Sequence, residues 1–298
     1  MKHTVGSMTL SNAQFGNFRL FTLETGTFLL DGGSMFGVVP KTLWSRQLEC
    51  DERNRVLLTA RVMLVHSAAT GRVYLIDSGI GHKFDEKFEK IYGLDLSGYT
   101  LESSLEYHGF RTSDITDVVF THLHFDHCGG AVRRGDDGQP ELTFPKAPHW
   151  VHTAQWDNVL HPNEREISSF LPENIKPLRE SGQIQLVDDG HVYEPGFEIV
   201  MVEGHTPGQQ LPLLSDGNRK LLFAADLLPT TSHLPLPWVM GFDTRPLLTL
   251  EDKKRVFSRC IRENILLFLE HDPHHELVTL SGTPQRPSVA WAGTLDDL

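Results

Sequence analysis

One short segment gathers most of the side chains that could bind a metal. Residues 121–130, THLHFDHCGG, place His122, His124, Asp126 and His127 within six residues, directly after the apolar run 117–120. A loop at the end of a strand lets successive side chains converge on one point, whereas alternate residues of the strand itself would diverge. An isolated HxH pair is often only a histidine-rich surface turn. The longer HxHxDH pattern, between a strand and a glycine pair, predicts a metal site.

Short strands have to position this segment. Apolar runs that are rich in β-branched residues and bounded by Gly, Asp or Pro predict strands at 60–67, 72–76, 117–121, 197–202, 220–225 and 265–270. The best-marked helix is expected to begin at Thr249, with Asp252 in the reciprocal capping-box position. Strands that alternate with helices through the whole length indicate an α/β layered protein.

The chain shows no internal division. Because no low-complexity linker or short repeat interrupts it, we predict a single domain over residues 1–298. Turn-forming residues at 135–140 predict a surface loop. The polar, proline-bearing stretch 161–177 is expected to be an insertion over the site.

Charge and cysteine content limit the partners and the compartment. The 27 basic and 39 acidic residues give a formal charge of −12, which argues against a nucleic-acid partner. The three cysteines fit neither a disulfide framework nor a thiolate zinc site and favour a reducing compartment. No window approaches the roughly 20 apolar residues of a membrane span, and the N-terminus does not resemble a signal peptide. We therefore expect a cytoplasmic protein without membrane insertion.

The segment 121–130 resembles the signature of the metallo-β-lactamase superfamily, and the resemblance covers nearly the whole chain. It implies an α/β fold in which two mixed β-sheets pack face to face with helices outside, an αββα sandwich. It also implies a metal ligand after each later strand: His205 in GHTPG, Asp226 in FAAD, and His271 after the run 265–270. Asp77, in LIDSG, would orient the metal loop or a ligand histidine without touching metal.

The resemblance further implies two divalent ions. His122, His124 and His205 would bind the first ion, and Asp226 would bridge the pair; the full ligand set is His122, His124, Asp126, His127, His205, Asp226 and His271. His274 and His275 are rivals for the last position, but His271 directly ends an apolar run. Zinc is the first choice of metal, and the same donors would accept manganese, iron or cobalt.

A filled ligand set favours a binuclear hydrolase over the iron-dependent persulfide dioxygenases, which keep the same signature. Two ions about 3.5 to 4 Å apart can hold a shared water as a bridging hydroxide, which attacks a carbonyl or phosphoryl centre. Asp126 would bind the second ion through one oxygen and pass a proton to the leaving group with the other. This makes Asp126 the candidate catalytic residue.

A closer resemblance concerns the substrate. The segments DGGSMFGVVPKTLW at 31–44, HPN at 161–163 and DLLPT at 226–230 are similar to quorum-quenching N-acyl-homoserine-lactone lactonases, particularly the YtnP-like group. The similarity implies hydrolysis of the ester bond of a lactone, a small-molecule substrate. Met35, Phe36 and Trp44 could then form an apolar wall for an acyl chain, although each could equally fill the core.

One departure widens the choice of substrate. Many lactonases carry a tyrosine three residues after the bridging aspartate, where this chain and the YtnP-like group have proline, here Pro229. Thr230, Thr231 and His233 are the candidates for supplying the missing polar group. Another ester, a thioester or an organophosphate triester is the alternative substrate. The oligomeric state stays open, with a homodimer as one option.

Overall fold

Two seven-stranded sheets dominate the computed structural model, which describes residues 10–298. The first sheet has the order β1 (Asn12–Phe15), β2 (Phe18–Asp31), β3 (Arg55–Ser67), β4 (Val73–Ile76), β5 (Asp117–Val119), β8 (His149–His152) and β9 (Ile184–Val187). Neighbouring strands are antiparallel from β1 to β4 and parallel from β4 to β9. This sheet is therefore mixed.

The second sheet is also mixed. Its order is β10 (Val192–Glu194), β11 (Phe197–Val202), β12 (Gln209–Ser215), β13 (Lys220–Phe223), β14 (Leu266–Phe268), β15 (Leu277–Thr283) and β16 (Arg286–Gly293). All neighbours are antiparallel except β13 and β14, which are parallel. The helix α8 lies between β13 and β14 in the chain, as a parallel crossover requires.

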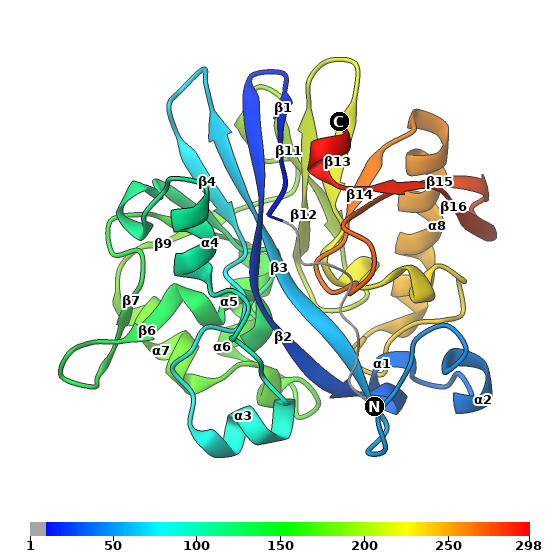
Figure 1. Ribbon diagram of the computed structural model, residues 1–298, viewed down its shortest axis with the longest axis horizontal. Coiled ribbons are helices and arrows are strands. Elements are labelled where there is room, and N and C mark those ends of the chain that lie inside the picture. The colour runs from blue at the N-terminus through cyan, green and yellow to red at the C-terminus, as the bar shows by residue number, and fades with distance from the viewer. Residues whose placement is uncertain (1–9) are drawn as a thin grey trace.

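The two sheets pack face to face around a shared apolar core (Figure 1). The rings of Tyr74 from the first sheet and Phe197 from the second meet edge to face, with centroids 5.1 Å apart. Strand β3 is continuously apolar because both of its faces are buried. Met63 and Val65 enter this core, while Val62 and Leu64 pack under helices on the other face.

Helices cover both outer faces. Leu105 of α4 (Leu101–Tyr107), Val159 of α6 (Thr153–Leu160) and Leu178 of α7 (Pro172–Glu180) pack with the first sheet. Val256 and Phe257 of α8 pack with the second sheet. Figure 1 shows these two groups of helices on opposite sides of the molecule. The predicted αββα sandwich is confirmed.

The start of α8 was predicted wrongly. The helix spans Pro246–Glu263, so Thr249 lies inside it rather than at its N-cap. A proline in the first turn has the backbone angle that a helix needs and lacks an amide that would need a partner, which favours this earlier start. Asp252 closes no capping box, because its Oδ2 accepts hydrogen bonds from the amides of residues 203 and 204 at 2.7 and 3.1 Å. This contact ties α8 to the loop after β11.

The remaining elements are short. They are the helices α1 (Gly32–Phe36), α2 (Lys41–Trp44), α3 (Glu86–Tyr92) and α5 (Phe125–Cys128), and the hairpin of β6 (Val132–Arg134) and β7 (Pro140–Leu142). The turn predicted at 135–140 closes that hairpin, where the Gly135 amide donates to the Gln139 carbonyl at 2.8 Å. Within residues 10–298, no helix has both the length and the apolar character that crossing a membrane requires.

The strands deliver the predicted site residues to common edges. Within the first sheet β4 and β5 run in the same direction, and Asp77 and His122 follow them. Within the second sheet β11, β13 and β14 share one direction, and His205, Asp226 and His271 follow them. The carboxyl ends of parallel strands lie at one edge of a sheet, so chain direction alone brings these side chains together.

Candidate metal centre

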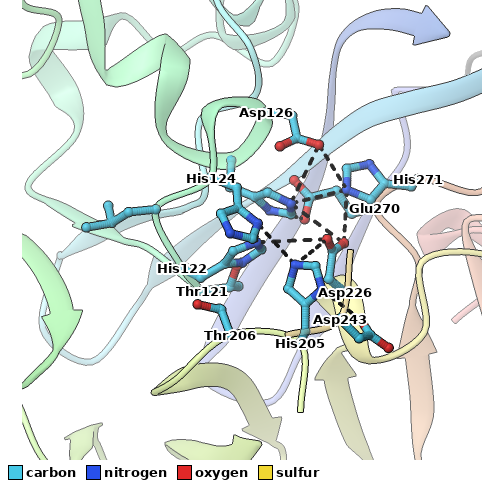
Figure 2. A network of polar contacts seen from close by, with 12 residues as sticks. Thr121, His122, His124, Asp126, His205, Thr206, Asp226, Asp243, Glu270 and His271 are labelled. Carbon is cyan, nitrogen blue, oxygen red and sulfur yellow. Dashed lines mark hydrogen bonds and ion pairs between the residues drawn. The ribbon is translucent and has the colours of Figure 1, made fainter. Parts of the chain in front are cut away.

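The predicted ligands form two adjoining groups beyond the ends of the strands that precede them. The first group is His122, His124, His205 and Asp226, and the second is Asp126, His127 and His271; within each group the nitrogen and oxygen atoms that could bind a metal lie within 4.8 Å of one another. All seven side chains are buried. Figure 2 shows that His122, His124 and Asp126 face His205, Asp226 and His271. The structure therefore brings together every ligand that the sequence predicted.

Asp226 belongs to the first group and also faces the second (Figure 2). Its Oδ2 is 3.1 Å from Nε2 of His205, and its Oδ1 is 3.1 Å from Nε2 of His271. Each oxygen of one carboxylate therefore faces a different group. This is the arrangement that a bridging ligand between two cations requires, because a full negative charge reduces their repulsion.

The imidazoles present bare nitrogens to the centre. Nε2 of His122 and Nε2 of His205 lie 3.0 and 3.1 Å from Nδ1 of His124, and Nε2 of His271 lies 3.2 Å from Nε2 of His127. In addition, the buried Oδ1 of Asp226 accepts no hydrogen bond. Lone pairs that converge in this way repel one another unless a cation lies between them, so the donor set fits metal ions.

Acceptors on the far side of each ring fix this orientation. For His205 the acceptor is Asp243 at 2.9 Å from Nδ1, and for His124 it is Glu166 at 3.0 Å from Nε2. The remaining rings use the same principle: Nδ1 of His122 lies 3.0 Å from Thr121 Oγ1, Nδ1 of His127 lies 3.0 Å from Asp77 Oδ2, and Nδ1 of His271 lies 2.8 Å from the Thr59 carbonyl. A ring that donates its proton outward keeps its inward nitrogen free as a ligand.

Asp77 holds the metal loop as well as a ring. Its Oδ1 accepts a hydrogen bond from the Thr121 amide, and its Oδ2 accepts one from the Thr121 hydroxyl, both at 2.7 Å. Asp77 has φ +56° and Ala225, next to Asp226, has φ +42°. Such left-handed backbone is costly for residues with a Cβ and is concentrated at functional sites. The chain thus accepts local strain at two turns that set the ligand positions.

Charge and burial oppose each other at the centre. Burial works to lower the pKa of His205, but the carboxylates of Asp226 and Asp243 outweigh it and raise this pKa to about 10. For His271, burial is again outweighed by Asp226, and the pKa rises to about 9. At His205 and His271 the nearby carboxylates therefore favour positive charge.

Sequence reasoning missed the residues that support the rings: Glu166, Asp243, Glu270 and Thr59. Glu166 and Asp243 follow their histidines by about 40 positions. Glu270 precedes His271, and its Oε2 lies 3.1 Å from Nδ1 of His127. The only signal was for Glu166, which lies in the polar stretch 161–177 that was expected to cover the site.

A cavity of about 220 Å³ opens onto the centre. Its floor includes metal-ligand candidates of both groups, and its walls are mostly apolar; the lining residues are Leu30, Asp31, Ser34, Met35, Leu58, Tyr92, His124, Phe125, Asp126, Ser168, Ser169, His205, Asp226, Met240, Phe242 and His271. No lysine or arginine is among them. The stretch 161–177 contributes Ser168 and Ser169, so part of it does lie beside the site.

Of the five residues predicted for the substrate pocket, only Met35 lines this cavity. Phe36 lies behind it in a buried stack, between Trp44 at 5.1 Å and His233 at 4.5 Å from ring centroid to centroid. Nδ1 of His233 lies 2.8 Å from the Thr230 hydroxyl, and its Nε2 lies 2.9 Å from the Met35 carbonyl. These contacts engage both polar groups away from the cavity.

The rivals of His271 lie outside both ligand groups. His274 is exposed, and its amide donates to Asp272. Nδ1 of His275 lies 3.3 Å from Oδ1 of the same carboxylate. Asp272 also accepts a hydrogen bond from the Thr231 hydroxyl at 2.8 Å, so this threonine is engaged as well.

Comparison with known proteins gives matches of three kinds. The family model described as the metallo-beta-lactamase superfamily matches residues 57–296. An N-acyl homoserine lactonase from a Bacillus species is 27% identical over 171 residues, which are 56% of this chain and 60% of that protein. The N-acyl homoserine lactonase AttM of Rhizobium radiobacter is 25% identical over 170 residues, with 55% and 61% covered. The matches thus span about 60% of the length of these curated relatives.

Solved structures match over more of the chain. A probable metal-dependent hydrolase from Staphylococcus aureus has a TM-score of 0.84 and 27% identity, covering 94% of this chain and 97% of that one. AidC, described as a dizinc quorum-quenching lactonase in complex with a product, has a TM-score of 0.77 and 22% identity, covering 94% and 96%. At the latter identity the likeness concerns the fold.

Proposed function

Since the chain belongs to the metallo-beta-lactamase superfamily, we propose that it is a hydrolase that opens the ester bond of an uncharged lactone, with N-acyl-homoserine lactones as the first class to test. The observation that carries this proposal is the Asp226 carboxylate, which faces both ligand groups below an apolar cavity. The curated relatives are lactonases by name, which supports the same class.

The proposed cofactor is a pair of divalent ions, with zinc as the first choice. One ion would be held by His122, His124 and His205. The other ion would be held by Asp126, His127 and His271, and both ions would be held by Asp226. Such a pair supplies Lewis acidity and makes water nucleophilic near neutral pH. The chain itself holds the donors in place through the acceptors behind each ring and excludes bulk water by burying them.

Asp126 is the proposed proton carrier. Its Oδ2 lies 3.9 Å from Nε2 of His127 and 3.8 Å from Nε2 of His271, and the residue also lines the cavity. A carboxylate that belongs to the second group and also reaches the substrate can return a proton to the departing alcohol oxygen. We therefore assign to Asp126 both ligand binding and proton transfer.

The cavity supports an uncharged substrate. No lysine or arginine lines it, and Asp31 lies on its wall, so the side chains of the cavity offer no cationic partner to the carboxylates of a substrate such as a glutathione thioester. The apolar side chains of Met35, Leu58, Met240 and Phe242 suit an acyl chain. A phosphotriester is also uncharged and remains the alternative substrate. The cytoplasm stays the proposed compartment, because the cysteines are free thiols.

The test is a substrate panel with measured metal content. The protein would be reconstituted with zinc, manganese or cobalt and assayed with homoserine lactones, aryl esters, an anionic thioester and a phosphotriester. We expect two ions per chain and the highest kcat/KM with the lactones. Efficient phosphotriester turnover without lactone turnover would support a hydrolase but refute the proposed lactone substrate. Full activity of a metal-free protein would refute the whole proposal.

A further inference from the structure

Glu166 is the buried carboxylate that lies behind the His124 ring. It lies directly before the 3-10 turn Ile167–Ser169, and its exposed fraction is 3%. Oε1 lies 3.0 Å from Nε2 of His124 and accepts a hydrogen bond from the Thr206 hydroxyl. Oε2 accepts hydrogen bonds from the side-chain amides of Asn158 at 3.0 Å and Asn163 at 3.2 Å. Every group around the carboxylate is thus a donor.

These donors fix the carboxylate in its ionised form and in one orientation. An ionised carboxylate only accepts hydrogen bonds, which matches this set of donors. Because Glu166 accepts the proton on Nε2, Nδ1 of His124 is left as the inward donor atom. That nitrogen lies 3.0 Å from Nε2 of His122 and 3.1 Å from Nε2 of His205, at the centre of the first ligand group.

Glu166 also belongs to a wall of the cavity. Ser168 and Ser169, two and three residues after it, line the cavity. Arg165, directly before it, donates a hydrogen bond to the Gly241 carbonyl. Gly241 lies between Met240 and Phe242, which line the cavity as well. One short segment therefore touches a metal-ligand candidate at Glu166 and joins two parts of the substrate wall on either side of it.

We propose that Glu166 is a positioning residue that holds His124 with Nδ1 toward the first metal ion and, through the same bonds, seats the serine wall of the substrate cavity. The inference rests on the proposed metal centre, but not on the identity of the substrate. Removal of Glu166 should weaken metal binding and also shift substrate binding. A purely structural role would lower stability alone.

The test measures metal affinity in the absence of substrate. Glu166→Gln is nearly isosteric and can still accept a hydrogen bond, but it lacks the charge; Glu166→Ala removes both. Partners of ligand histidines are typically worth about 10- to 100-fold in metal affinity. We expect losses of this size in competition with a chromophoric chelator, smaller for Gln than for Ala. The visible spectrum of the cobalt-loaded Gln variant should also change, since the field around the first ion changes.

Glu276→Gln is the matched control. Glu276 is also buried and hydrogen-bonded, to the Ser11 hydroxyl at 2.6 Å and the Leu295 amide at 2.8 Å, but it touches no ligand. It should keep wild-type metal affinity even if its unfolding midpoint falls. If Glu166→Ala does not fold, the metal affinity and the cobalt spectrum of Glu166→Gln alone test the proposal. Wild-type metal affinity and an unchanged cobalt spectrum in a folded Glu166→Gln would overturn the proposal.

Steady-state kinetics test the second half of the proposal. With saturating metal, Glu166→Gln should raise KM for the best substrate of the panel, and Ser168→Ala should raise KM without changing metal affinity. An unchanged KM in a fully loaded Glu166→Gln would refute the link to the serine wall. Absence of lactone turnover in the wild type would instead refute the proposed substrate, while the chelator titration still tests Glu166.

Discussion

Replacing Phe36 by alanine should test whether this residue is core or pocket. Its ring is fully buried, stacked face to face on Trp44 and His233, with Trp238 edge-on at 5.9 Å. Removal of such a ring typically costs about 3–5 kcal/mol, because apolar contact is lost and a cavity remains. That loss is a large part of the roughly 5–15 kcal/mol that stabilises an ordinary domain.

The matched variant is Met35→Ala. Met35 precedes Phe36 and is also buried, but it lines the cavity. If an acyl chain packs against Met35, each buried methylene of a longer chain is worth up to about 0.8 kcal/mol, or about fourfold in kcat/KM. Met35→Ala should weaken this dependence on chain length. Phe36→Ala should instead lower kcat/KM by a similar factor for every chain length.

The assay combines urea unfolding with kinetics at fixed free metal. Unfolding gives the change in the stability of each variant. Measurements of kcat/KM for lactones of increasing chain length give the slope of log kcat/KM against chain length. A Phe36→Ala variant that is nearly as stable as the wild type, yet shows a flattened slope, would refute this placement of the ring. The residue would then contact substrate directly.

Three further predictions concern the last metal ligand, a buried histidine of β8 and a close backbone contact before His205. His271→Ala should reduce the metal content to about one ion per chain, whereas His274→Ala should leave about two, as metal analysis can show. His149 is fully buried and burial lowers its pKa from 6.5 to about 4, so its contribution to stability should fall as the pH drops from 6.5 to 4. The loss should approach roughly 3 kcal/mol, and His149→Phe should flatten that part of the pH profile of unfolding. Gly204→Ala should destabilise the protein by about 1–3 kcal/mol and lower its metal affinity. A Cβ at this position would lie 2.2 Å from the Thr249 amide nitrogen and would push the loop that carries His205 away from α8. An unchanged melting temperature and metal content would contradict this prediction.

The ligands could be predicted because their positions depend on short-range pattern. A buried apolar run followed by His or Asp is visible in the sequence at Asp77, His205, Asp226 and His271. Where several strands share a direction, their ends meet without any further information. The ligand positions could therefore be predicted without knowledge of side-chain packing.

The supporting residues depend on packing between distant segments. Glu166 reaches His124 only because the stretch after α6 folds back over the metal loop, and Asp243 reaches His205 in the same way from the loop before α8. The pocket wall was uncertain for a similar reason: Met35 and Phe36 have the same apolar character, and only the packed stack separates cavity from core. The start of α8 was predicted wrongly because Thr249 fits the local pattern of an N-cap, whereas the helix begins one turn earlier at Pro246.

The position of the ligands along the chain has a consequence for synthesis. His122 to His127 are made early, Asp226 much later, and His271 only near the C-terminus, on the far side of α8. A ribosome that has just completed Asp226 has supplied all four members of the first group but not the second. The donors of the first group are thus all synthesised before the second group is complete. The order of synthesis therefore makes His271 the last donor of the proposed metal centre.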